Sequence, residues 1–161
     1  MTHSPLEIAT AYHEAGHAVI ALALGRPVQR VSVQANHLRL GQCELKKGAG
    51  RPARDAVETE ILILLGGLAA EARQTGAYAR GAAVQDLRGV RLLLQTRAAS
   101  PRQAERLERR LLDKTEHILD QPGVWLATEQ IAEELLRSTT ISGRAARHLF
   151  QQAIAAADSD P

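Results

Sequence analysis

Aromatic residues are scarce in this chain of 161 residues, which holds one Trp, two Tyr, one Phe and a single cysteine. So few aromatic rings cannot form the stacking platform on which proteins hold single-stranded nucleic acid. The 20 lysines and arginines nearly balance 18 acidic residues, and the net charge is only +2. Cys43 alone excludes an internal disulfide and a metal cluster built from several cysteines. We therefore expect no nucleic-acid partner.

Long apolar runs are also missing. The longest, residues 61–70, is interrupted by two glycines and is shorter than the roughly 20 residues that span a bilayer. The start of the chain shows no basic-then-apolar leader, and the sequence contains no Gly-x-x-x-x-Gly-Lys-Ser/Thr phosphate loop. We expect a cytoplasmic protein that does not insert into a membrane and does not hydrolyse ATP through such a loop.

The remaining composition, rich in alanine and leucine, favours helices. Serine caps, prolines at first helical positions and Gly or Pro stops divide the chain into predicted segments. Two short alternating segments around Val31 and Leu38 predict a strand pair. The predicted fold is α+β and mostly helical, in one domain covering 1–161. The expected helices cover residues 5–24, 53–74, 84–99, 101–120 and 124–137, with a last one capped by Ser142.

Arginines cluster in the fourth predicted helix, in the segment "RQAERLERR" at residues 102–110. They alternate with glutamates, which is typical of a helix face in contact with solvent. We interpret this segment as a solvated face, with a binding patch as the alternative.

The segment "HEAGH" at residues 13–17 has the pattern His-Glu-x-x-His. On a helix, His13 and His17 lie on one face, so both imidazoles can bind one cation, as tetrahedral zinc requires. Glu14 lies about 100° round the helix, which suits a base acting on a metal-activated water rather than a ligand. The alternative is a pair of half-exposed helix histidines without a metal.

Gly16 within this motif is costly in a helix interior, by roughly 0.5–1 kcal/mol relative to alanine. A helix tolerates that residue where a substrate, a strand or another backbone must come close. We therefore expect a close approach at Gly16.

A catalytic zinc needs a third protein ligand. Asp86 follows a glycine-rich connection at the start of a helix; the alternative is a first-turn acid favoured by the helix dipole. Glu71 lies on the helix 53–74, where an acid can complete a zinc site, or can pair with surface charges. The downstream candidates are Glu58, Glu60, Glu71, Asp86 and His117.

Several segments together resemble the peptidase domain of the FtsH-type ATP-dependent zinc metalloproteases. "YHEAGHAV", a strand segment with "LRLG", "LLGGLAAEA", "GAAVQDL" and the closing "IAEELLRSTTISGRAARHLF" occur in the family's order over nearly the whole chain. The family usually has Arg where this chain has Leu68. The resemblance implies a zincin-like domain with a small β-sheet beside the His-Glu-x-x-His helix and a bundle of C-terminal helices. Its zinc-site core would be 1–99, its C-terminal helices 100–157 and its frayed tail 158–161.

The resemblance also implies site residues. The two histidine ligands would be His13 and His17, the catalytic glutamate Glu14 and the aspartate ligand Asp86, so that Glu71 would be a supporting acid. The expected function is a Zn2+-dependent endopeptidase acting on unfolded or flexible polypeptides. The alternative is a weakly active or inactive binding or regulatory module that keeps the zinc site. The family further implies a homo-oligomer, a hexamer, and we expect that an ATPase partner, if needed, acts in trans.

Substrate binding is expected at the strand around residues 38–43. An extended peptide can add to an exposed sheet edge as a further strand. The candidate residues for this contact are Leu38, Leu40 and Gly41, and the alternative is a strand that is merely paired within the sheet.

Overall fold

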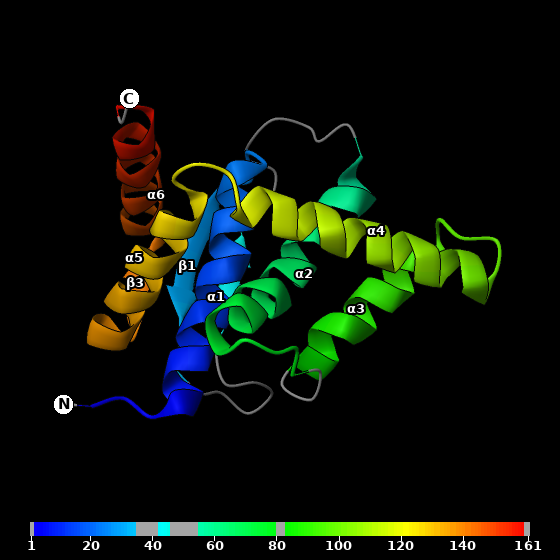
Figure 1. Ribbon diagram of the computed structural model, residues 1–161, viewed down its shortest axis with the longest axis horizontal. Helices are drawn as coiled ribbons and strands as arrows, with labels where there is room; N and C mark the ends of the chain where they lie inside the picture. The colour runs from blue at the N-terminus through cyan, green and yellow to red at the C-terminus, as the bar shows by residue number, and fades with distance from the viewer. Residues whose placement is uncertain (1, 35–41, 46–54, 80–82, 160–161) are drawn as a thin grey trace.

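Helices dominate the computed structural model, which describes residues 2–34, 42–45, 55–79 and 83–159 (Figure 1). The α+β, mostly helical class is therefore confirmed. No described helix is both long enough and apolar enough to traverse a bilayer. The elements are α1 (Pro5–Ala23), β1 (Val28–Ser32), β2 (Gln42–Leu45), α2 (Ala56–Thr75), α3 (Val84–Gln95), α4 (Pro101–Leu119), α5 (Val124–Ser138), β3 (Thr140–Ser142) and α6 (Gly143–Asp158).

Serine caps begin three of these helices where the sequence predicts them. Ser4 and Glu7 form a complete capping box at α1, with the Ser4 N–H donating to the Glu7 carboxylate at 2.6 Å. Ser100 and Ser142 each accept a first-turn N–H of α4 and α6. A cap of this kind satisfies a backbone donor that lacks an intrahelical partner, which is why the local sequence locates these helix starts well.

The second, third and last helices differ from their predicted bounds. The second helix begins at Ala56 rather than residue 53, because the Asp55 carboxylate caps it by accepting the N–H groups of Val57 and Glu58. The third ends at Gln95 rather than residue 99, and α6 continues helically through Asp158, where a frayed tail was expected to begin. The start of the second helix was misplaced because the prediction followed proline and missed the aspartate cap.

A three-stranded sheet lies beside α1, in the order β2-β1-β3, with both pairs antiparallel. The predicted strand pair corresponds to β1 and β2, although residues 38–40 lie outside the described part of the chain. Strand β3 was not predicted from the sequence, because three residues between two helices are too few for a recognisable alternation. In Figure 1 the sheet lies between α1 and α6.

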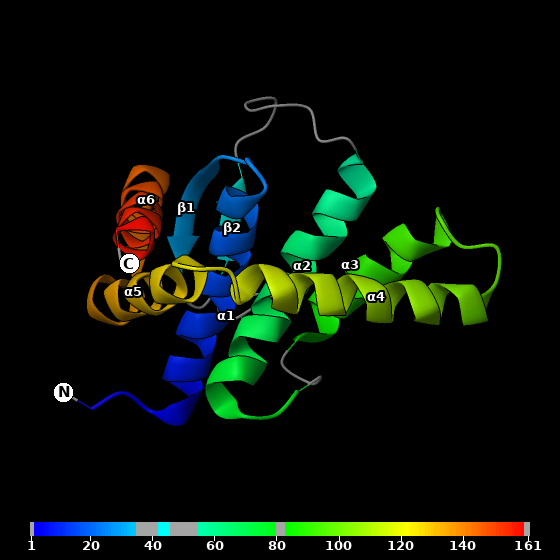
Figure 2. The ribbon, with the colours of Figure 1, turned by 45° about the horizontal axis from the view of Figure 1, so that its top comes forward.

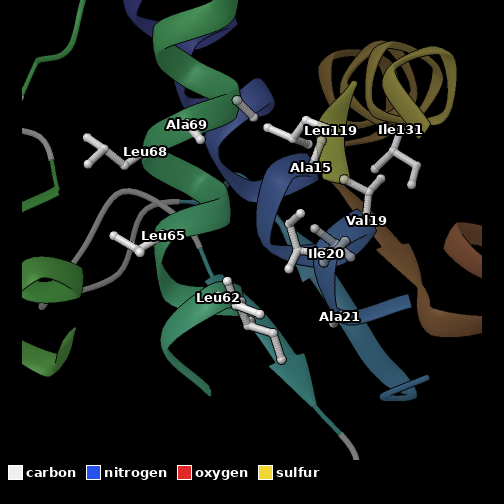
Figure 3. Close-up of a cluster of buried hydrophobic side chains, with 14 of the residues drawn as sticks. Ala15, Val19, Ile20, Ala21, Leu62, Leu65, Leu68, Ala69, Leu119 and Ile131 are labelled. Atoms are coloured by element: carbon white, nitrogen blue, oxygen red, sulfur yellow. The ribbon is translucent and has the colours of Figure 1, made fainter. Parts of the chain in front are cut away.

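The core is built on the contact between α1 and α2, where the expected close approach at Gly16 is confirmed. A Cβ on Gly16 would overlap the backbone carbonyl oxygen of Gly66 and lie 2.6 Å from the Ala70 Cβ. The two backbones therefore touch, and Ile20 and other buried side chains close the interface on either side (Figure 3). This contact positions α2 against the histidine face of α1.

The C-terminal helices do not form one bundle, contrary to expectation. The α4 helix packs on α2 and α3, whereas α5 packs on α1 and α6, and α6 packs on β1 (Figure 2). The physical reason is that α4 has one narrow buried stripe, Leu111, Thr115 and Leu119, and α2 already occupies it.

We expect Gly16→Ala to lower the free energy of unfolding by about 1–3 kcal/mol or more, because rigid backbone faces the new methyl group. This loss exceeds the roughly 0.5–1 kcal/mol that alanine gains over glycine in a helix. Urea denaturation measures it. Gly89→Ala is the control, because its Cβ would meet only the flexible end of Leu64, at 3.2 Å. Equal stability of the two variants would contradict the backbone contact.

Candidate metal centre

The middle of α1 carries three polar side chains into the interior. His13, Glu14 and His17 are 9%, 5% and 6% exposed, and their neighbours on the helix are buried alanine, valine and isoleucine. One ligand atom from each of the three lies within 4.8 Å of the other two. The alternative of half-exposed surface histidines is therefore wrong, and burial of polar groups at this depth requires partners.

The Nε2 atoms of both histidines converge on one carboxylate oxygen. Asp86, in the first turn of α3, places its Oδ2 atom 2.8 Å from Nε2 of His13 and 3.2 Å from Nε2 of His17. The two Nε2 atoms are 3.1 Å apart. Three potential ligand atoms from two distant segments thus meet at one point.

Helix α2 holds the opposite nitrogen of each ring. His17 donates its Nδ1–H to the backbone carbonyl of Ile63 at 2.7 Å, and His13 donates its Nδ1–H to the Glu71 carboxylate at 3.0 Å. Glu71 is itself buried. Partners at Nδ1 fix the ring orientation and direct Nε2 toward the shared point, an arrangement typical of histidines that bind metals.

The electrostatics of the cluster favour an ion pair. Burial disfavours a charged imidazole, but hydrogen bonds to Asp86 and Glu71 outweigh it and raise the pKa of His13 to about 9. Burial likewise acts to raise the pKa of Asp86, yet hydrogen bonds with His13 and His17 hold it well below its usual range. The aspartate is therefore ionised at neutral pH, the form in which a carboxylate binds a cation.

Gly67 of α2 leaves room beside the two Nε2 atoms. A Cβ at this position would lie 2.6 Å from Nε2 of His17 and 2.7 Å from Nε2 of His13. Ile63, Gly67 and Glu71 are spaced four residues apart, so they share one face of α2. On that face the Ile63 carbonyl accepts from His17 and the Glu71 carboxylate accepts from His13. Between them, Gly67 has no side chain and leaves space beside both rings.

The donor set and its spacing fit a metal ion. Two imidazole nitrogens and a carboxylate oxygen are ligands that zinc accepts at about 2.0–2.2 Å, which separates neighbouring ligands by about 3.3 Å in a tetrahedron. The observed separations are 2.8, 3.1 and 3.2 Å. The space that a Gly67 Cβ would fill adjoins the same two nitrogens. The cluster could therefore hold a cation with little rearrangement.

The other candidate ligands lie elsewhere. Glu58 accepts a hydrogen bond from Lys114, Glu60 pairs with Arg26, and His117 contacts Gln121. Each of these interactions is at the surface. Leu38, Leu40 and Gly41, the predicted substrate contacts, lie outside the described residues.

Sequence reasoning missed two parts of this centre, the Ile63 carbonyl and Gly67. A backbone carbonyl gives no signal in a sequence, because every residue has one. The pair Gly66–Gly67 inside an apolar helix was a usable signal, because each glycine disfavours the helix and thereby indicates a close neighbour.

Comparison with known proteins gives one partial similarity. No protein-family model matches the chain. The ATP-dependent zinc metalloprotease FtsH 1 of Sorangium cellulosum (strain So ce56) is 40% identical over 79 residues. The match covers 45% of this chain and 12% of that protein, so the chain corresponds to a small part of its relative. The similarity supports a protease-related function in general terms.

Proposed function

We propose that this chain is a zinc-dependent endopeptidase of the zincin type that hydrolyses unfolded or flexible polypeptides. His13, His17 and Asp86 would hold the Zn2+ ion, and Glu14 would act as general base. The observation that carries the proposal is the convergence of both Nε2 atoms on Asp86 Oδ2, with each Nδ1 already engaged. The similarity to a zinc metalloprotease supports it.

In the proposed peptide hydrolysis, the metal ion would act as a Lewis acid, and residues of the chain would transfer the proton and orient the metal ligands. A Zn2+ ion held by His13, His17 and Asp86 would supply Lewis-acid activation, lowering the pKa of a water to about 7 and polarising the scissile carbonyl. Glu14, adjacent to His13 on α1, takes the proton from the attacking water and later delivers it to the leaving amine. Glu71 and the Ile63 carbonyl keep both imidazoles in the required orientation. Burial of the cluster limits competition from bulk water.

Metal analysis together with a cleavage assay tests the proposal. We expect the purified protein to bind one equivalent of zinc by elemental analysis and to cleave a casein-like unfolded substrate, with cleavage stopped by a chelator and restored by zinc. Bound zinc without cleavage would support the alternative, a regulatory module that keeps the site. Absence of zinc binding would contradict both. Oligomeric state and an ATPase partner remain predictions from the family resemblance.

We expect Glu71→Gln to weaken zinc binding by about 10- to 100-fold, because the His13 ring loses a charged acceptor at Nδ1. Competition with a chromophoric chelator measures the zinc dissociation constant. Glu60→Gln on the same helix is the matched control, because Glu60 pairs with Arg26 at the surface. An equal affinity for both variants would show that Glu71 does not support the metal centre.

A further inference from the structure

A cavity of about 390 Å³ lies between the first turns of α2, the segment after α3 and one face of α4. None of its lining residues belongs to the metal centre. Figures 1 and 2 both show α4 passing α2 and running beside α3. The volume is within the range of about 300–1,000 Å³ that small-molecule sites occupy.

The floor of this cavity is apolar. Ile61 of α2 and Leu111 of α4 are buried there, and Val57 and Leu107 lie half-buried beside them. Leu107 and Leu111 are one helical turn apart, so they form a continuous apolar strip along α4. A ligand that reaches this floor must have a hydrocarbon body.

Two exposed arginines place positive charge at the rim of the cavity. Arg106 and Arg110, one turn apart on α4, line the cavity and are exposed, and neither forms an ion pair or hydrogen bond with any described residue. The residues three and four positions from Arg106 are Arg102, Gln103, Arg109 and Arg110, none of them acidic. Asp113 lies three positions after Arg110 but is exposed and forms no ion pair with it among the described residues. Two like charges at this spacing repel each other.

The acids of the cavity wall do not neutralise these arginines. Asp55 accepts the first N–H groups of α2 and a hydrogen bond from Arg97 at 2.7 Å. Glu58 accepts a hydrogen bond from Lys114 at 2.8 Å. Both carboxylates are thus engaged by other donors, whereas Arg106 and Arg110 are exposed residues of the cavity lining.

We propose that this cavity binds a small organic carboxylate with an apolar body, its head on Arg106 and Arg110 and its body on the floor. A planar guanidinium matches a carboxylate through two parallel hydrogen bonds, which is why arginine suits this recognition. For these two arginines the proposal takes the alternative of a binding patch in place of the solvated face. This site is independent of the metal centre and of the proposed peptidase function.

Octanoate is the probe, titrated into isotopically labelled protein and followed by NMR. We expect saturable binding, with the largest shifts around Ile61 and Leu111. Acetate, which has the same head without the body, should bind at least tenfold more weakly. Equal binding of acetate, shifts centred elsewhere, or no saturation with octanoate would overturn the proposal.

Paired double variants test the charge. Arg106→Gln with Arg110→Gln should weaken octanoate binding at least tenfold, because charge-assisted hydrogen bonds are lost. Arg102→Gln with Arg109→Gln removes the same charge from α4 outside the cavity lining and should change affinity less than twofold. Equal weakening by both pairs would mean that only the overall charge attracts the anion. Circular dichroism checks that all variants are folded.

Discussion

Glu14→Gln should retain bound zinc and lose about 100- to 10,000-fold in kcat/KM on an unfolded substrate, the contribution typical of a positioned general base. The amide has nearly the shape of the carboxylate, so it fits the same buried position, but it cannot accept a proton from water. His13, His17 and Asp86 are unchanged and keep their convergent geometry. Cleavage of a fluorogenic casein, with zinc measured in the same sample, gives both quantities.

A control for this result is Glu105→Gln, which makes the same chemical change at an exposed position of α4. It should leave kcat/KM unchanged. Undiminished hydrolysis by zinc-loaded Glu14→Gln would rule out Glu14 as the base. Loss of zinc along with activity would instead indicate that Glu14 helps to hold the metal, since its carboxylate belongs to the same buried group.

Gly67→Ala should abolish zinc binding while the protein stays folded. The added methyl group would lie 2.6 and 2.7 Å from the two Nε2 atoms, closer than real Cβ contacts allow, so both rings must turn away from their common point. We expect the zinc dissociation constant to rise at least about 100-fold, beyond the usual effect of losing one supporting hydrogen bond. Elemental analysis and chelator competition measure this without any assay of activity.

Measuring the free energy of unfolding of Gly67→Ala shows whether zinc is lost through a local change at the histidines or through loss of the fold. Alanine favours a helix over glycine by roughly 0.5–1 kcal/mol, which offsets part of the strain at residue 67. Gly89→Ala serves as the comparison, because its methyl group would meet a flexible leucine end rather than the imidazoles. Normal zinc binding by Gly67→Ala would contradict the assignment of the metal position beside Gly67. If Gly67→Ala is unfolded at the assay temperature, zinc is measured in the same variant at a lower temperature at which circular dichroism shows it folded, and zinc binding there would likewise contradict the assignment.

Much of the fold follows from local patterns. The starts of α1, α4 and α6 coincide with serine caps, because a cap is satisfied within its own first turn and does not depend on distant residues. The predicted start of α2, residue 53, was three residues too early, because it was placed directly after a proline whereas the helix is capped by Asp55. The strand β3 was missed because a three-residue strand exists only through its pairing with β1.

The His13–Glu14–His17 arrangement also follows from local sequence, because helical periodicity alone brings side chains four residues apart to one face. The acid that meets their Nε2 atoms could not be chosen this way. Asp86 and Glu71 lie 73 and 58 positions from His13, and both contact it. Residue patterns left the two acids as alternatives, and the family resemblance favoured Asp86. The packing of α2 and α3 on α1 places Asp86 at Nε2 and Glu71 at Nδ1.

Tertiary structure likewise decided the role of the glycines and of the arginine-rich helix. Gly16 and Gly66 let two backbones touch, and this contact brings Gly67 beside the Nε2 atoms of His13 and His17. Arg106 and Arg110 differ from Arg102 and Arg109 only because α2 and α4 enclose a cavity on one side of the helix. Caps and periodicity act over a few residues and can be read along the chain. Distances between side chains far apart in sequence depend on how helices pack, which no local pattern specifies.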